Sequence, residues 1–311
     1  MSGPDVSICV CTVHRAAMLQ RCLDSLARLL LPAGLRVEIV VVDNDAQGSA
    51  RLAAARVAQR CAWPLRYVVE PEPGVSFARN RCVMEAAAPW VAFIDDDEAA
   101  APDWLAQLWR VASSGQVDGV FGPVLAEYAT VPDPVLRASG AHQRPRYPTG
   151  TRMAWGDCRT GNVLFRRELH PRVGGFGERF AHSGGEDCDF FWCALELGAR
   201  LVWCDEAIVR EHVPAERMTS GWVLRRAYVG GRNFTTLRTV HLGWRTGLRD
   251  RLWGLAGVLL YAAPVIWSVL VQSERRLLWQ RKSAGSLGKL LAPVAAGAAQ
   301  RSGAARSAAA G

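Results

Sequence analysis

Residues 90–98 read WVAFIDDDE, five apolar side chains followed directly by four acids. A short continuous apolar run of this kind predicts a strand that is buried on both faces of a sheet. Similar runs precede it in the chain at Val6–Thr12, Val37–Asp43 and Leu65–Val69. Strands that alternate with helices in this way predict an α/β fold, with a mostly parallel central sheet covered by helices on both faces.

Helical stretches separate these strands. Apolar side chains recur at helical spacing from Ala16 to Leu31, and Pro32 ends that run. Further helices are predicted at Ser49–Cys61, Val75–Ala87, Pro102–Ser114, Glu186–Leu197 and Ser220–Leu237, with another strand at Arg200–Cys204. The Pro-rich stretch Val131–Tyr147 is predicted to be an irregular loop over a cleft.

Acidic residues follow the predicted strands at their carboxyl ends, where parallel sheets bind ligands. Asp43 and Asp45 follow the second strand, and the run of residues 95–98 follows the fourth. Turn formation explains the first pair, but four consecutive acids repel one another unless a cation or a solvated loop relieves them. Because carboxylate oxygens suit Mg²⁺ or Mn²⁺, we expect a metal on Asp97, with Asp95 beside it facing a ribose.

A second acidic cluster follows two glycines at residues 184–190, GGEDCDF. Acids at a helix start can serve only as caps and complement the helix dipole, and that interpretation stays open. Three acids exceed that need, and a carboxylate near a metal-bound diphosphate is well suited to act as a general base. We expect Asp187 to be this base, with Glu186 supporting it or contacting the acceptor.

Charge is concentrated at the end of the chain. The sequence has 37 Lys and Arg against 29 Asp and Glu, and from Arg251 onward eight bases accompany a single acid, Glu274. A near-neutral body with a basic tail is typical of a membrane-facing protein and argues against nucleic acid as a partner. Nine cysteines without a CxxC pair or a secretory signal favour a reducing cytoplasm and no zinc site.

The segment Leu252–Val271 has twenty residues without a charge, enough to cross a hydrocarbon core of ~30 Å. Basic residues flank it on both sides, and Pro264 interrupts it. A membrane span, an interfacial helix and a buried core helix all remain open. We therefore expect a catalytic domain over residues 1–240, a membrane-associated segment over 241–282, and a partly disordered Ala/Gly/Ser-rich tail over 283–311.

Seven segments together resemble glycosyltransferase family 2, in particular bacterial exopolysaccharide enzymes of the succinoglycan type. They are VSICVCTVHR, VVVDN, PGVSFARNRC, VAFIDDDE, RTGNVLFRR, GGEDCDFFW and EHVPAERMTSGWVLRRA, and they span about residues 6 to 240. The resemblance implies a GT-A fold and an inverting, metal-dependent single displacement from a nucleotide-diphosphate sugar, with a UDP-sugar as the family's commonest donor.

The resemblance also implies roles for individual residues. Asp95 and Asp97 would form the metal-binding DxD pair, with His212 as a further ligand of the metal or diphosphate, and Asp187 would be the base. The residues expected to bind the nucleotide sugar are Thr12, Arg15, Asp43, Arg79, Asn80, Asp95, Asn162, Arg217 and Arg225.

The sequence lacks the QxxRW pattern of processive relatives, which predicts the addition of a single sugar. The apolar segment and its basic flanks suggest a lipid-linked saccharide as acceptor, at the cytoplasmic face of the bacterial inner membrane. Two alternatives remain: a sugar nucleotidyltransferase, and a catalytically inactive membrane-bound scaffold of a polysaccharide assembly complex. An oxidoreductase is disfavoured because no GxGxxG follows the first strand.

Overall fold

A seven-stranded sheet forms the centre of the first of two units, which comprises residues 1–127 and 143–212 of the computed structural model. The structure describes residues 3–293. The strands follow one another across the sheet as β3 (Leu65–Val69), β2 (Val37–Asp43), β1 (Val6–Thr12), β4 (Trp90–Ile94), β8 (Asn162–Arg166), β6 (Gly119–Phe121) and β9 (Leu201–Trp203). The first four are parallel, and β8 runs antiparallel to both of its neighbours, so the predicted mostly parallel sheet is confirmed.

The register of the strands places the polar residues at their ends along one edge of the sheet. Thr12 at the end of β1 pairs with Asp43 at the end of β2. Ile94, the last residue of β4, pairs with Asn162 at the start of the antiparallel β8. The acids that follow β4 therefore lie beside the carboxyl ends of β1 and β2, the edge at which parallel sheets bind ligands.

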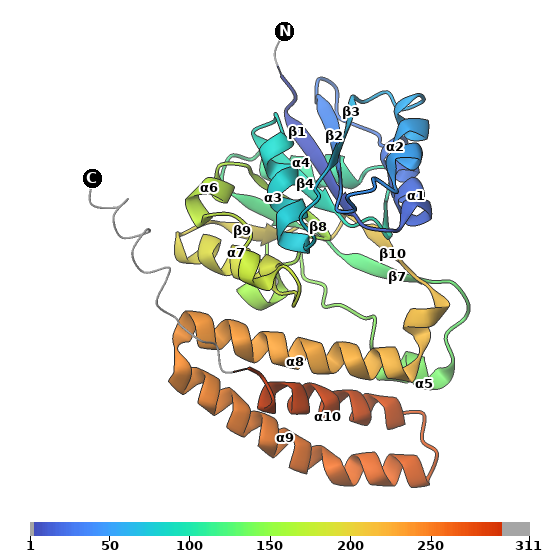
Figure 1. Cartoon of the computed structure of the whole chain (residues 1–311), viewed down its shortest axis with the longest axis vertical. Helices are drawn as coiled ribbons and strands as arrows, with labels where there is room; N and C mark the ends of the chain where they lie inside the picture. The colour runs from blue at the N-terminus through green and yellow to red at the C-terminus, as the bar shows by residue number, and fades with distance from the viewer. Residues whose placement is uncertain (1–2, 294–311) are drawn as a thin grey trace, which may run out of the picture. The chain divides into compact units, whose positions relative to one another are not determined.

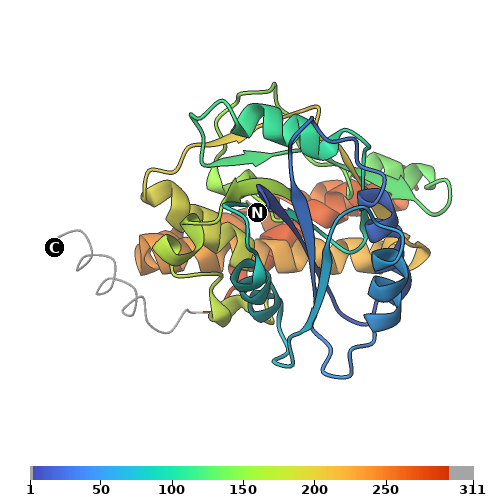
Figure 2. The same ribbon diagram turned by 90° about the horizontal axis from the view of Figure 1, so that it is seen from above.

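Helices cover the two faces of this sheet (Figures 1 and 2). One apolar core joins the sheet to α1 (Ala16–Leu26), α2 (Arg51–Ala58) and α4 (Trp104–Ala112), and a second joins it to α3 (Val75–Glu85), α6 (Leu169–Val173) and α7 (Glu186–Glu196). In α1 the fully buried residues Leu19, Cys22, Leu23 and Leu26 recur every three or four positions. That spacing places them on one face of a helix, which explains why the stretch packs as one.

A smaller sheet follows the acidic run. Its strands lie in the order β5 (Glu98–Ala100), β10 (Val209–Val213) and β7 (Val124–Tyr128). β5 and β10 are antiparallel, with Glu98 opposite Glu211. This pairing brings the end of the 143–212 segment back to the acids after β4. The short helices η1 (Trp155–Asp157) and η2 (Glu178–Phe180) complete this unit.

The second unit, described over residues 128–142 and 213–293, is mainly helical. It contains α5 (Pro134–Ser139), η3 (Ala215–Met218), α8 (Ser220–Leu242), α9 (Trp244–Leu270) and α10 (Arg276–Leu290). The predicted domain boundary at residue 240 falls inside α8, and residues 283–290, predicted as tail, belong to α10. The tail beyond residue 293 lies outside the described residues.

Glycines let the three long helices of this unit pack closely. A methyl group built on Gly231 of α8 would overlap the backbone of Gly285 in α10, and one on Gly288 of α10 would overlap Tyr228. On α9, a methyl group at Gly254 would lie 2.7 Å from the backbone of α10. Small residues at helix contacts of this kind are typical of membrane-associated bundles, where close backbone approach replaces the hydrophobic effect.

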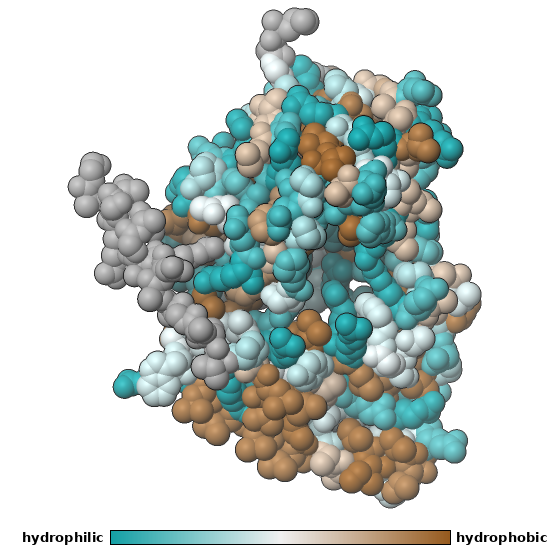
Figure 3. Space-filling view, in the orientation of Figure 1, coloured by the Kyte–Doolittle hydropathy of each residue, from teal (hydrophilic) through white to brown (hydrophobic). Residues whose placement is uncertain are grey.

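α9 is the helix, within residues 3–293, that is long and apolar enough to cross a membrane. Only 11% of its most apolar stretch is buried, so it is not the core helix that the sequence had left open. Figure 3 shows the apolar side chains gathered over this helix. Its large exposed side chains include Leu252, Trp253, Leu259, Leu260, Ile266, Trp267 and Leu270.

Candidate active site

Asp96 ties the end of β1 to the acidic run. Its carboxylate accepts a hydrogen bond from the Thr12 hydroxyl at 2.8 Å and one from Arg15 at 3.2 Å. Burial raises the pKa of Asp96 to about 6, although both of these contacts oppose the rise. Thr12 and Arg15, predicted to line the nucleotide pocket, therefore meet at one buried carboxylate. No pattern in the sequence distinguishes Asp96 from the acids on either side of it.

Asp97 and His212, predicted to bind a metal together, are neighbours. The His212 amide donates to the Asp97 carbonyl at 2.8 Å, an arrangement set by the pairing of β5 with β10. Both residues line one small cavity together with Met18 and Arg21. The Asp97 carboxylate also lies 3.5 Å from the Arg15 guanidinium.

Arg79 joins the two acidic clusters that the sequence separates by some ninety positions. Its guanidinium lies 3.6 Å from the Asp95 carboxylate and forms an ion pair with Glu186 at the start of α7. The Arg79 and Glu186 side chains are only 9% and 5% exposed, so their ion pair is shielded from solvent. Burial raises the pKa of Asp95, with Arg79 opposing and Asp97 adding to the effect.

Glu98 is the most buried member of the acidic run. One of its oxygens accepts from the Asp95 amide at 3.0 Å, and the other has no hydrogen-bond partner among the described residues. Burial raises the pKa of this carboxyl well above its ordinary value. A methyl group at Gly161 would lie 2.7 Å from the unpartnered oxygen, which explains why the TGN sequence needs a glycine there.

The acidic run has the donor chemistry that a divalent cation requires. Asp95, Asp97 and the unpartnered oxygen of Glu98 are hard oxygen donors, and they occupy one edge of the sheet. Mg²⁺ and Mn²⁺ prefer such donors and keep positions open for phosphate oxygens. In donor chemistry, these residues suit a divalent cation.

The start of α7 presents Asp187 differently from its neighbours. Gly184 and Gly185 have φ angles of 75° and 102°, a conformation that only glycine adopts readily, and they turn the chain into the helix. Glu186 is buried against Arg79, whereas Asp187 is partly exposed and accepts from the Cys188 amide at 2.7 Å. Asp187 is thus more accessible to an acceptor than Glu186.

Arg159 is a further charged residue near this helix start. Its guanidinium lies 2.8 Å from the Cys188 sulfur and interacts electrostatically with Asp187. No pattern in the sequence distinguished this arginine from others. Arg144 is similar: it pairs with Glu211 at 2.6 Å, and its charge acts on Asp95 and Glu98.

The carboxylate of Asp43 is hydrogen-bonded to other groups of the protein. This carboxylate is fully buried and accepts hydrogen bonds from the Tyr67 hydroxyl at 2.6 Å, the Ala50 amide at 2.8 Å and the Asp45 amide at 3.2 Å. Asp43 therefore shapes the loop after β2. A direct contact of its side chain with a nucleobase stays a prediction.

Asn80 and Asn162 are also engaged in structural hydrogen bonds. The Asn80 amide group bonds to both backbone groups of Phe176 and to the His170 ring. Asn162 is buried, and its amide group bonds to the Trp104 indole and to two backbone carbonyls. Asn162 stands opposite the end of β4, but its side-chain groups point into the protein.

Arg217 and Arg225 belong to the second unit, in η3 and α8. The Arg217 guanidinium lies over the ring of Trp222 at 6.0 Å. Their predicted contact with the diphosphate remains a prediction.

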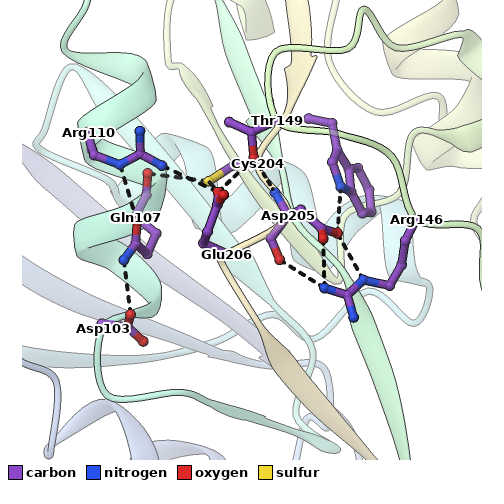
Figure 4. A network of polar contacts seen from close by, with 9 residues as sticks. Asp103, Gln107, Arg110, Arg146, Thr149, Cys204, Asp205 and Glu206 are labelled. Carbon is purple, nitrogen blue, oxygen red and sulfur yellow. Dashed lines mark hydrogen bonds and ion pairs between the residues drawn. The ribbon is translucent and has the colours of Figure 1, made fainter.

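A polar network fixes the turn between β9 and β10 (Figure 4). Arg146 binds both carboxylate oxygens of Asp205, at 2.9 and 2.8 Å, and lowers the pKa of Asp205. Glu206 accepts from Thr149 at 2.7 Å and from Arg110 of α4 at 3.3 Å. This network holds the chain that leads into β10, and hence His212.

The sequence pattern of glycosyl transferase family 2 matches residues 7–174. The chain belongs to glycosyltransferase family 2. It is 34% identical to the succinoglycan biosynthesis protein ExoM of Rhizobium meliloti over 232 residues, 73% of this chain and 72% of that protein. It is 28% identical to the uncharacterized glycosyltransferase EpsJ of Bacillus subtilis, over 66% of this chain and 60% of the relative.

Solved structures agree with this assignment at the level of the fold. The mannosyltransferase PcManGT of Pyrobaculum calidifontis, in complex with GDP-Man and Mn²⁺, superposes with a TM-score of 0.61 at 22% identity, covering 94% of this chain and 88% of that one. TarS of S. aureus, in complex with UDP-GlcNAc, gives a TM-score of 0.52 at 17% identity over 91% and 89%. The predicted GT-A fold and the glycosyltransferase class are confirmed, and the nucleotidyltransferase alternative is set aside.

Proposed function

We propose that this glycosyltransferase moves one sugar from a nucleotide-diphosphate sugar to an acceptor hydroxyl, in a single displacement that inverts the anomeric centre. The observation that carries the proposal is the contact of the buried Arg79 side chain with both Asp95 and Glu186. It holds the acids after β4 and the start of α7 at one edge of the sheet. A donor-binding cluster and a proton acceptor are both required in a displacement of this kind.

The nucleotide end of the donor is assigned to the end of β1. Thr12, Arg15 and Asp96 form a connected polar group there, and Asp43 holds the neighbouring loop in place. Asp95, which is partly exposed, is the carboxylate proposed to face the ribose. We propose UDP as the nucleotide because it is the commonest in this family.

Asp95, Asp97 and His212 would hold Mg²⁺ or Mn²⁺, which, when bound, neutralises the charge that develops on the leaving diphosphate. The adjacent arrangement of Asp97 and His212 and the unpartnered Glu98 oxygen support this assignment. Arg15 contacts Asp96 and Asp97 and supplies positive charge on the nucleotide side. Arg217 and Arg225 are proposed to neutralise part of the negative charge on the leaving diphosphate.

Asp187 is proposed to accept the proton of the acceptor hydroxyl as that hydroxyl attacks. It is the partly exposed acid at the start of α7, whereas Glu186 is engaged by Arg79 and Asp189 by Arg179. A carboxylate that must receive a proton from a bound acceptor needs this access. Glu186 and Arg79 would then orient the helix start that carries the base.

The proposed acceptor is a lipid-linked saccharide at the cytoplasmic face of the bacterial inner membrane. The support is the exposed apolar face of α9 and the likeness to a succinoglycan biosynthesis protein. The transfer is proposed to be non-processive, since the chain lacks the QxxRW pattern.

The assignment is tested by separating donor binding from proton transfer. Asp97→Asn should lose both the Mn²⁺-dependent thermal shift produced by UDP and the release of nucleotide diphosphate from UDP-sugars in membranes. Asp187→Asn should keep the thermal shift and lose turnover. Glu168→Gln, at an exposed acid before α6, is the matched control and should keep both.

Normal turnover in Asp187→Asn eliminates this residue as the base. Turnover of the unaltered protein that is unchanged by removal of divalent cations eliminates the metal assignment. The absence of nucleotide-diphosphate release from every donor with intact membranes would instead favour the inactive scaffold.

A further inference from the structure

The second unit contains a cavity of about 350 Å³ between α8, α9 and α10, with Ala141 at its edge. Its volume lies at the lower end of the range for small-molecule sites, roughly 300–1,000 Å³, and suits a compact head group. The residues that give it its chemistry are Trp222 and Arg226 of α8, Tyr261 of α9, and Arg281, Lys282 and Lys289 of α10.

Four cations and no carboxylate line this cavity within the part of the chain that the structure describes. Residues 128–142 and 213–293 hold 14 Lys and Arg against four Asp and Glu. Two of those four acids are engaged elsewhere: Asp250 pairs with Arg238 at 2.6 Å, and Asp133 caps α5. The unit therefore has few acids left to neutralise the cavity.

Arg281 is the cation that most needs a counter-charge. It is half-buried, burial lowers its pKa, and its guanidinium donates to the Gly140 carbonyl at 2.9 Å. Within the described residues it forms no salt bridge, and neither do Lys282 and Lys289. A guanidinium withdrawn from water without an anion is costly, so an anionic ligand here would restore the balance.

Aromatic rings fix the positions of Lys282 and Lys289 without neutralising their charges. The Lys282 ammonium lies 4.9 Å from the Trp279 ring centre and 5.7 Å from that of Tyr261. The Lys289 ammonium lies 4.9 Å from the ring of Phe234. Cation–π contacts of this kind orient a charge and leave it able to bind an anion.

The cavity borders the apolar helix. Tyr261, which lines it, belongs to α9, and Leu259 and Leu260 just before it are 68% and 69% exposed. An anion that enters the cavity can therefore carry a hydrocarbon chain that lies along α9. Free nucleotides and sugars lack such a chain, whereas phosphate-bearing lipids have both parts.

We propose that this cavity binds the phosphate or diphosphate head group of a membrane lipid through Arg226, Arg281, Lys282 and Lys289. Every residue of the site belongs to the second unit, so the proposal does not depend on the sugar transfer proposed above. The shared chemistry is a lipid phosphate ester, which either an anionic phospholipid or a polyprenyl phosphate or diphosphate can supply.

The experiment measures binding of the full-length chain to vesicles by co-sedimentation at fixed ionic strength. Three sets of vesicles are compared: phosphatidylcholine alone, phosphatidylcholine with phosphatidylglycerol, and phosphatidylcholine with polyprenyl diphosphate at equal negative charge. We expect binding to the second and third sets to exceed binding to the first. Stronger binding to the third set than to the second identifies the polyprenyl lipid as the source, and equal binding identifies the phospholipid.

The matched variants separate the cavity from general surface charge. Lys282→Gln with Lys289→Gln removes two cavity charges and should weaken binding to phosphate-bearing vesicles roughly tenfold or more. Arg245→Gln with Arg249→Gln removes two exposed charges of α9 outside the cavity and should weaken it less than about threefold. Lys282→Gln alone removes one exposed cation and leaves the glycine contacts between the helices in place, so its melting temperature should stay close to that of the unaltered protein.

Equal weakening by the two double variants would overturn the proposal, because surface charge alone would then explain the binding. Equal binding of the unaltered chain to all three sets of vesicles would overturn it as well. Since neither readout uses a sugar donor, failure here leaves the proposed glycosyl transfer intact.

Discussion

Arg79 shows how one side chain can connect two distant parts of a sequence. It lies on the buried face of α3, and its guanidinium contacts both Asp95 after β4 and Glu186 at the start of α7. Its neighbour Arg81 lies on the same helix and forms a surface pair with Glu85 at 2.8 Å. The two arginines therefore offer a comparison of a buried with an exposed ion pair on one element.

Arg79→Gln should lower the free energy of unfolding by about 3–5 kcal/mol, because it leaves Glu186 as a buried charge without its partner. Arg81→Gln should change it by no more than about 1 kcal/mol, since exposed pairs contribute little. Urea unfolding of the full chain, followed by tryptophan fluorescence, measures both. Similar losses in the two variants would show that Arg79 acts as an ordinary surface residue.

His170 should make the folding stability of the first unit depend on pH. Because the Asn80 amide nitrogen donates to Phe176, its oxygen is the acceptor for His170, whose Nε2 must carry the proton. Burial lowers the pKa of His170 below the ordinary 6.5. Below that pH the unfolded chain binds a proton before the folded one does, so stability is retained above about pH 6.5 and lost as pH falls.

Replacing this residue tests the argument. In the unaltered protein the free energy of unfolding should fall by up to about 1.4 kcal/mol per pH unit below pH 6.5 from this group. His170→Gln should remove that part of the slope, and the exposed His182→Gln should leave it unchanged. Denaturation curves at pH 7.5 and pH 5 measure it, and identical slopes in all three proteins would contradict the assignment.

Residue patterns indicate which strand ends are polar, and the structure shows which protein group each side chain there contacts. Asp97 and His212 were expected together and are neighbours. Asp43, Asn80 and Asn162 were expected to bind the nucleotide sugar, which stays a prediction, and their side chains form hydrogen bonds with groups of the protein. Local sequence marks a strand end as polar, whereas the partner of each polar atom depends on which loops the fold brings beside it.

At the scale of elements, the four parallel strands begin and end at the predicted residues, because a buried strand is bounded by its apolar run. Helix ends were less accurate. α1 ends at Leu26 rather than Leu31, although Pro32 allows the longer helix. The stretch predicted as an irregular loop contains α5, which Asp133 caps by accepting from the Leu136 amide. Such ends depend on local capping and packing that apolar spacing does not encode.

Gly231 and Gly230 are adjacent in α8 and allow a controlled test of its packing against α10. A methyl group on Gly231 would overlap the backbone of Gly285, whereas one on Gly230 would meet nothing within 4 Å. Gly231→Ala should therefore lower the melting temperature, because α10 must move away. Gly230→Ala should raise it slightly, since alanine favours an exposed helix interior by roughly 0.5–1 kcal/mol.

Limited proteolysis gives an independent readout of this contact. In Gly231→Ala, cleavage between α9 and α10 should accelerate, and in Gly230→Ala it should not. Equal melting temperatures for the two variants would show that α8 and α10 do not need close backbone approach.

At the scale of the whole molecule, charge is divided between the units in a way that the linear sequence conceals. The first unit has 21 Lys and Arg against 25 Asp and Glu, so it is acidic. The body of the chain looked near-neutral because α8, with its many cations, was counted with the catalytic domain. The boundary at residue 213, and the membership of residues 128–142 in the second unit, follow from packing rather than from composition.

Membrane association should therefore depend on the exposed apolar side chains of α9 in the second unit, and not on the isolated exposed apolar side chains of the first unit. Ile266→Glu with Trp267→Glu places two charges on the face of α9, at side chains that are 61% and 68% exposed. Leu52→Glu with Met84→Glu changes side chains that are 72% and 71% exposed in the first unit. All four positions are exposed, so the difference between the pairs reports the surroundings and not the loss of core packing.

A charge in the hydrocarbon region costs about 2.5–3.5 kcal/mol, and less toward the interface. The α9 pair should accordingly reduce partitioning into membranes by roughly a hundredfold or more, while the pair in the first unit should leave it within about twofold. Flotation of cell membranes measures the partitioning, and the Mn²⁺-dependent thermal shift with UDP checks that the catalytic unit is intact. Release of the unaltered protein by high salt alone, or equal partitioning of the two variants, would show that the apolar face of α9 does not enter the bilayer.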